Sequence, residues 1–172
     1  MNQYLSSLKK KIDQFNETIG KATSWLTSFL VVLVCFDVFT RYILEDSSIA
    51  VQELQWHIFA IIFLLAAAYT LHADEHVRVD LFYSKLNERN QAIINLLGVL
   101  FFLLPFCIAI IISSQDFVLN SFKYGETSPD PGGLPARYIL KAILPFSAFL
   151  ILLQGISLLL KSFMKLFPGE SN

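Results

Sequence analysis

The sequence predicts an all-α integral membrane protein with four transmembrane helices, an N-terminal amphipathic surface helix and both termini in the cytoplasm. Three observations lead to this prediction. Hydrophobic residues make up 55% of the 172 residues and charged residues only 16%, whereas a soluble domain is about half apolar and about a quarter charged. The charges crowd into short segments, which leaves four apolar blocks long enough to cross a bilayer. Lys and Arg are also divided unevenly between the connecting segments.

Residues 2–20 precede the first apolar block and are predicted to form an amphipathic helix. Apolar residues recur there every three or four positions, opposite a face that carries Lys9, Lys10 and Asp13. The apolar stripe consists of Leu5, Leu8, Ile12, Phe15 and Ile19. A short soluble coiled coil is the alternative. The nearby membrane span favours a helix on the cytoplasmic membrane surface, with its lysines facing anionic lipid.

Four transmembrane helices are predicted in one membrane domain, residues 1–172. They cover residues 22–43, 54–71, 92–112 and 138–160, and each is close to the roughly 20 residues that a helix needs to cross a bilayer. Pro105 and Pro145 lie inside the last two. Because neighbouring groups can satisfy the carbonyls that proline frees, we expect kinks there rather than breaks.

The orientation follows from the basic residues. With both termini inside, nine Lys and Arg residues fall in cytoplasmic segments and four at periplasmic ends and loops, as the positive-inside rule requires. The second outer loop, residues 124–138, contains three prolines and three glycines, so we expect tight turns there. This loop is either a compact connector or a surface shaped for a partner.

Residues 72–76 read HADEH and match the H-x-x-E-H pattern of inverted zinc peptidases. A catalytic zinc needs a third protein ligand. His57 is the only other histidine, and it lies about 20 Å from His72 along a straight helix. We therefore interpret the stretch as the point where the second span leaves the lipid. A membrane metal enzyme using His72, Glu75 and His76 is kept as an alternative.

Two pairs of ionisable residues lie four positions apart near the outer ends of the first two spans. Asp37 and Arg41 share a helix face and are expected to pair, and Glu53 and His57 repeat the spacing. A small self-assembling exporter that uses Asp37 is a further alternative. Gln154 and Asn95 are single polar residues in apolar spans. Both are expected to hydrogen-bond across helices.

Several classes of function lack their sequence signals. The net charge of −1 does not indicate a nucleic-acid partner. There is no P-loop, dinucleotide-binding fingerprint or nucleophile elbow, and no span carries a central carboxylate or a glycine-interrupted ion site. The residues therefore indicate a membrane subunit of a larger assembly, without a metal or cofactor of its own.

Four segments, taken in order, resemble the small membrane subunit of tripartite ATP-independent periplasmic (TRAP) transporters, the DctQ-type family. They are FTRY (39–42), QELQWHIF (52–59), HADEHVRVDLF (72–82) and SPDPGGLPARY (128–138). The resemblance implies a multi-pass protein of the bacterial inner membrane that is not an enzyme. It also implies a large DctM-type subunit that holds the sodium and substrate sites, and a periplasmic binding protein that captures an organic anion, commonly a carboxylate.

The small subunit would then act as a scaffold, and its polar residues near the membrane boundaries become candidates for contacts with partners. These candidates are Asp37, Arg41, Glu53, His57, His72, His76, Arg78, Asp80, Asp130 and Arg137. We expect the two histidines of HADEH to lie at the lipid–water boundary or to hydrogen-bond a partner helix.

Overall fold

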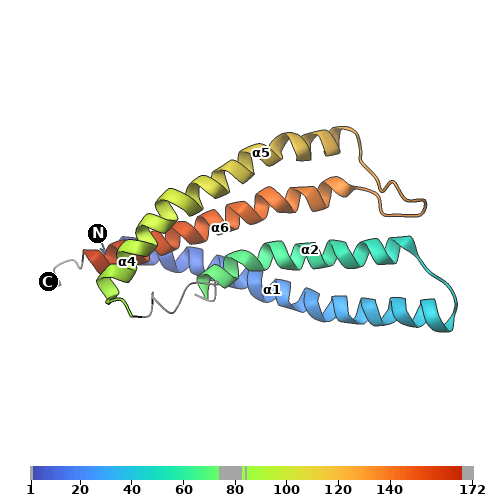
Figure 1. The fold of residues 1–172 in the computed structure, drawn as a ribbon, viewed down its shortest axis with the longest axis horizontal. Helices are drawn as coiled ribbons and strands as arrows, with labels where there is room; N and C mark the ends of the chain where they lie inside the picture. Colours follow the sequence, from blue (N-terminus) through green and yellow to red (C-terminus); the bar gives the residue numbers. More distant parts are fainter. Residues whose placement is uncertain (1, 74–82, 84, 168–172) are drawn as a thin grey trace.

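The computed structural model describes residues 2–73, 83 and 85–167, and its regular structure there is entirely helical (Figure 1). The elements are α1 (Asn2–Ile43), α2 (Ile49–His72), α4 (Glu88–Gly98), the π-helical turn η1 (Val99–Leu103), α5 (Leu104–Lys123) and α6 (Arg137–Leu166). In this part of the chain, four helical stretches are long and apolar enough to cross a membrane: Tyr4–Ile43, Ile49–His72, Glu88–Lys123 and Arg137–Leu166. The predicted all-α membrane class is therefore confirmed.

The helices form an open layer in which α6 is central. Helix α6 packs against α1, α2, α4 and α5, and α1 also packs along α2, whereas α5 has no comparable contact with α1 or α2. The start of α1 and the end of α6 lie together at one end, which we call the terminal end (Figure 1). The α1–α2 and α5–α6 connections lie at the other, the loop end. The chain thus leaves broad faces of α1 and α5 uncovered.

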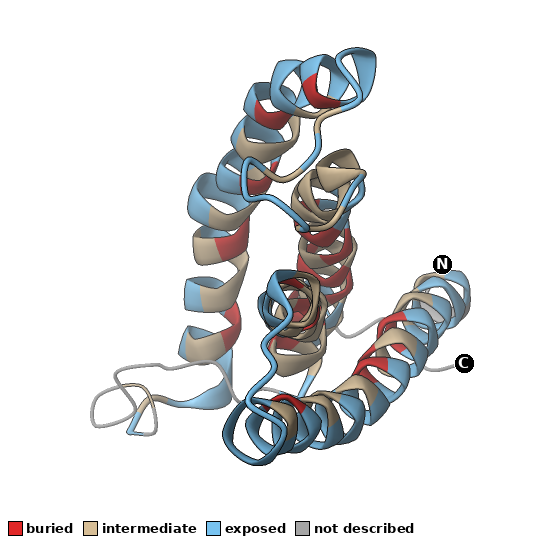
Figure 2. Ribbon diagram, turned by 90° about the vertical axis from the view of Figure 1, so that its right-hand side faces the viewer, coloured by how far each residue is buried: buried red, intermediate tan, exposed pale blue. Residues whose placement is uncertain are grey.

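The core is narrow: Figure 2 shows buried residues on the inward faces of several helices, and α6 carries the largest group of them. Ala148, Leu150 and Ser157 are almost completely buried there. Close approach depends on small residues: a Cβ on Gly155 would lie 2.5 Å from Leu103 Cδ2, and one on Gly20 would lie 2.5 Å from Tyr69 Cγ. Small residues are a common means of helix packing in membranes, where van der Waals contact drives association.

Large apolar side chains remain exposed along α1 and α5. Phe29, Phe36 and Phe39 of α1 are each about half exposed, and Phe106 and Ile112 of α5 are 64% exposed. In water such faces would be unfavourable, but in a bilayer they can contact lipid or another subunit. The exposed faces belong to the helices that lie at the edges of the layer.

The N-terminal segment differs from the prediction in one respect. Residues 2–20 are helical, but they continue without interruption into the first span as the single helix α1. Asp13, which we predicted on the polar face beside Lys9 and Lys10, is only 8% exposed. Asp13 does lie beside Lys9, but it faces polar partners on α6, which a helical pattern by itself does not reveal.

Both prolines are accommodated within helical rods. The third rod passes through a π-turn in which the Leu104 N–H bonds to the Val99 carbonyl, directly before Pro105. A π-turn re-routes backbone hydrogen bonds next to a residue that has no N–H, and the rod bends in this region (Figure 1). Helix α6 continues through Pro145. The predicted absence of breaks is confirmed.

The connection between α5 and α6 consists of turns, as predicted. Gly125 and Gly132 have φ values of 57° and 82°, and Ala136, directly before α6, has a φ of 60°. The Ser128 N–H bonds to the Leu134 carbonyl at 3.0 Å, and the Arg137 N–H bonds to the Glu126 carbonyl at 2.9 Å. These bonds fold the loop onto the start of α6.

Candidate functional site

A buried group of polar side chains joins three helices near the terminal end. We call it the terminal cluster; it consists of Lys9, Asp13 and Asn16 of α1, His72 of α2, and Gln154 and Ser157 of α6. The Asp13 carboxylate is its centre. Its Oδ1 accepts from Ser157 Oγ at 2.5 Å and from Gln154 Nε2 at 3.0 Å, and its Oδ2 lies 2.5 Å from Lys9 Nζ.

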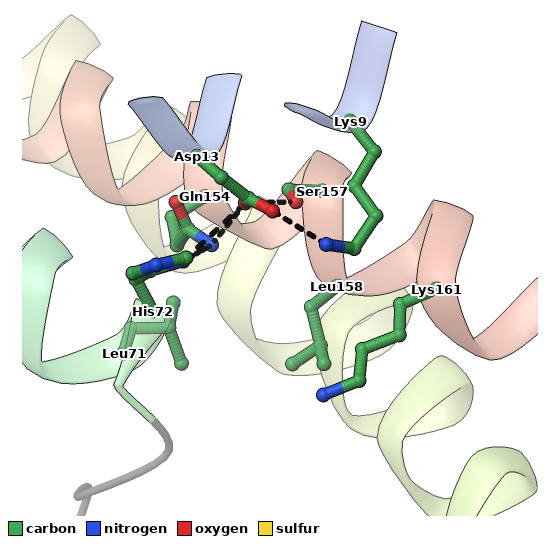
Figure 3. A pocket seen from close by; sticks show the side chains of 8 residues that line it. All are labelled: Lys9, Asp13, Leu71, His72, Gln154, Ser157, Leu158 and Lys161. Carbon is green, nitrogen blue, oxygen red and sulfur yellow. Dashed lines mark hydrogen bonds and ion pairs between the residues drawn. The ribbon is translucent and has the colours of Figure 1, made fainter. Parts of the chain in front are cut away.

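Gln154 connects the remaining members of the terminal cluster. Asn16 Nδ2 donates to Gln154 Oε1 at 2.8 Å, so the glutamine amide both accepts and donates. His72 Nδ1 lies 3.4 Å from Asp13 Oδ1 and from Gln154 Nε2 (Figure 3). The prediction that Gln154 hydrogen-bonds across helices is confirmed. Because a buried carboxylate is costly unless paired, these bonds hold α1, α2 and α6 in one arrangement.

A second group, the loop cluster, consists of Glu53 of α2, Ser128 and Leu134 of the loop, and Arg137 of α6. Glu53 Oε1 accepts from Ser128 Oγ at 2.5 Å and from Arg137 Nη2 at 2.8 Å, and Oε2 accepts from the Leu134 N–H at 2.6 Å. The Arg137 guanidinium also lies 5.7 Å from the centre of the Trp56 ring. One carboxylate thus fixes the α5–α6 loop and the start of α6 against α2.

Glycine is required inside the loop cluster. A Cβ on Gly133 would lie 2.4 Å from Ser128 Oγ and 2.8 Å from Glu53 Oε2. Contacts that short do not occur without displacement, so the loop needs a residue without a side chain at this position. The predicted pairing of Glu53 with His57 was wrong, because the Glu53 carboxylate turns toward the loop and His57 Nδ1 lies 2.6 Å from the Glu53 backbone oxygen.

Asp37 and Arg41 form the ion pair that their spacing predicted. The Asp37 side chain is 5% exposed and that of Arg41 is 42% exposed. Asp37 Oδ1 is buried and has no hydrogen-bond partner among the described residues. Next to the loop, Glu126 pairs with Lys141, and the Lys141 ammonium holds the pKa of the Glu126 carboxyl below its ordinary value.

Two other candidates touch the loop cluster only through backbone atoms: the Asp130 N–H bonds to Ser128 Oγ at 3.1 Å, and His57 Nδ1 contacts the Glu53 backbone oxygen. Asp130 is exposed at the loop end, and His57 is partly buried on α2. His76, Arg78 and Asp80 lie outside the described residues. Within residues 2–73 and 85–167, no group of three His, Cys, Asp or Glu side chains is placed to hold a metal ion. Asn95 donates to the Tyr83 hydroxyl at 2.8 Å.

Comparison with known families decides what this helix layer belongs to. The family model described as "Tripartite ATP-independent periplasmic transporters, DctQ component" matches residues 30–164. The chain belongs to the DctQ family. It is therefore a component of a TRAP transporter in the inner membrane and not an enzyme. No curated protein and no solved structure gave a match.

The DctQ match begins within α1 and leaves residues 2–29 outside it. Asp13 and Asn16 belong to that segment, and our sequence reasoning did not recognise them as site residues. The spacing of polar residues could have indicated them. Asp13 and Asn16 lie three positions apart on α1, and Gln154 and Ser157 lie three positions apart in an otherwise apolar span. Polar residues at such spacings on two membrane helices are expected to face each other.

Proposed function

We propose that this DctQ subunit is the fixed scaffold of a sodium-coupled TRAP transporter that imports an organic anion, most simply a carboxylate. The observation that carries the proposal is the open helix layer, whose central helix α6 is packed on several sides while apolar faces of α1 and α5 stay uncovered. A subunit built in this way offers a large apolar surface to a partner.

The partner we propose is the large DctM-type membrane subunit. In this proposal it covers exposed apolar side chains of the helix layer and holds the sodium and substrate sites, so that the DctQ subunit carries neither sodium nor another cofactor. The terminal cluster supports a fixed role, because its charged and polar groups bond to one another. A transport site would instead leave polar groups free for a ligand.

We further propose that the terminal end is cytoplasmic and that the loop end meets the substrate-loaded periplasmic binding protein. The excess of Lys and Arg in segments at the terminal end supports this orientation. Of the two lysines predicted to face anionic lipid headgroups, Lys10 is exposed and would do so, whereas Lys9 is paired with Asp13. At the loop end, Glu45, Asp46 and Asp130 are exposed and can contact a basic surface.

The scaffold role is tested by sodium-driven uptake into proteoliposomes. We expect uptake when the large subunit, the DctQ subunit and the loaded binding protein are all present. Neither membrane subunit should support it alone. Uptake at the full rate by the large subunit without the DctQ chain would disprove the proposal.

Docking is tested with the double variant Glu45→Gln, Asp46→Gln, because both side chains are exposed in the α1–α2 connection. We expect a several-fold higher binding-protein concentration for half-maximal uptake, since charges on an interface rim mainly affect the association rate. The matched control is Glu17→Gln, an exposed acid on the N-terminal half of α1. Equal kinetics in both variants and the wild type would remove these loop-end acids from the mechanism.

A further inference from the structure

A small cavity lies beside the terminal cluster, between α1, α2 and α6. Its volume is about 90 Å³. The lining is mixed: Leu71 and Leu158 are apolar, and the polar part includes Lys161 together with members of the terminal cluster (Figure 3). A second cavity of similar size lies between α4 and α6 and shares Leu158 and Lys161 with the first. Lys161 therefore borders both cavities.

The charges around the two cavities do not balance. Asp13 is paired with Lys9, and Glu88 lies 3.2 Å from Lys165. The Lys161 ammonium has no ion-pair or hydrogen-bond partner among the described residues, and no dashed line reaches it in Figure 3. The lining thus carries one uncompensated cation.

The cavities lie at the depth where the apolar helices end. Residues 142–160 contain no charged residue, and Lys161 is the first charge that follows them. Residues 54–71 likewise contain no Asp, Glu, Lys or Arg, and His72 comes next. A lysine at the end of an apolar helix places its ammonium in the headgroup region of the bilayer.

From this combination we infer a binding site for the phosphate of an anionic membrane phospholipid, with Lys161 as its central cation. The phosphate compensates the Lys161 charge, and Lys9 keeps two ammonium protons free for it, because only one is needed for Asp13. Leu71 and Leu158 give the adjoining apolar surface for the start of an acyl chain. A bound lipid of this kind would join α1, α2, α4 and α6 at the terminal end.

The test is native mass spectrometry of the full-length chain, released from detergent micelles with phosphatidylglycerol or phosphatidylcholine added. We expect one saturable phosphatidylglycerol and weaker binding of phosphatidylcholine. Lys161→Gln should weaken phosphatidylglycerol binding about fivefold, the size of one cation near a lipid phosphate. Lys161→Arg should retain the binding. Because Lys161 is exposed, circular dichroism should show unchanged helix content in both variants.

The matched control is Lys10→Gln, which removes the same charge from an exposed position at the same end, outside both cavities. Lipid binding equal to that of the wild type in this variant would support a localised site. Equal losses in Lys10→Gln and Lys161→Gln would show a diffuse surface effect and overturn the inference. Binding of inorganic phosphate that displaces phosphatidylglycerol at millimolar concentration would overturn it too, because the ligand would then be a free anion. None of these outcomes depends on transport.

Discussion

Each of the two polar clusters is centred on a buried carboxylate, but the two carboxylates stabilise different parts of the structure. In the terminal cluster, Asp13 bonds to side chains of α6 that are 141 and 144 residues away, and the groups it joins all belong to long helices. In the loop cluster, Glu53 bonds to one helix terminus and to a loop, including a backbone N–H. The first arrangement fixes helices relative to one another, and the second gives a loop its shape.

Loss of the single carboxylate should therefore have different consequences in the two clusters. Helices α1, α2 and α6 cannot separate at the terminal end without a general loss of structure. The terminal cluster should therefore contribute to global stability. A loop can open while the helices below it remain packed. The loop cluster should therefore affect the surface at the loop end, and through it the proposed docking of the binding protein.

The largest effect is expected for Asp13→Leu. This change leaves Lys9, Gln154 and Ser157 without their shared acceptor, and we expect the free energy of unfolding to fall by about 2 kcal/mol. The measurement is denaturant-induced unfolding in mixed micelles, followed by circular dichroism. Glu17→Leu is the control, because Glu17 forms an exposed pair with Lys21 and such pairs contribute little. Equal stability of the two variants would show that the terminal cluster does not hold the helices.

The next effect is expected for Glu53→Gln, which removes the charge that three donors share. We expect amide hydrogen exchange in residues 126–136 to become about tenfold faster, while exchange in α6 beyond its first turns stays unchanged. Hydrogen exchange with mass spectrometry resolves these segments. Uniformly faster exchange across all helices would place Glu53 in the same class as Asp13 and remove the contrast between the clusters.

A smaller and purely steric effect is expected for Gly133→Ala, which changes no charge. The new Cβ would displace Ser128 from Glu53. Amide hydrogen exchange in the loop should therefore again be faster than in the wild type, but slower than in Glu53→Gln. Gly98→Ala is the matched control, because a Cβ there meets nothing within 4 Å. If both alanine variants behave like the wild type, the loop accommodates a side chain and the cluster does not depend on this glycine.

The smallest effect concerns the pH dependence of the loop. The pKa of Glu126 is lowered by Lys141 in the folded protein, so this pair stabilises the loop above the ordinary glutamate pKa of about 4.3. That contribution is lost as the pH falls through the lowered folded value. We expect hydrogen exchange near Glu126, corrected for the intrinsic rate, to accelerate in acid. Glu126→Gln should weaken this dependence, and the part that persists would belong to Glu53, which holds the same loop. An unchanged dependence in the variant would show that Glu126 does not contribute.

The sequence predicted the features that depend on local patterns. The four apolar blocks identified the membrane helices, and the four-residue spacing of Asp37 and Arg41 identified their ion pair. The α6 partners of Asp13, and the loop and α6 partners of Glu53, could not be predicted in this way. They lie more than 70 residues away along the chain, and helical periodicity says which residues share a face but not which helix that face meets.

The different roles of the two clusters can be tested by comparing two variants in the assembled transporter. Tagged DctQ chains carrying Asp13→Leu or Glu53→Gln are co-expressed with the large subunit, and both co-purification and sodium-driven uptake are measured. We expect Asp13→Leu to reduce co-purification and uptake together. We expect Glu53→Gln to leave co-purification intact and to raise the binding-protein concentration needed for half-maximal uptake. Full assembly with Asp13→Leu, or failed assembly with Glu53→Gln, would contradict these expectations.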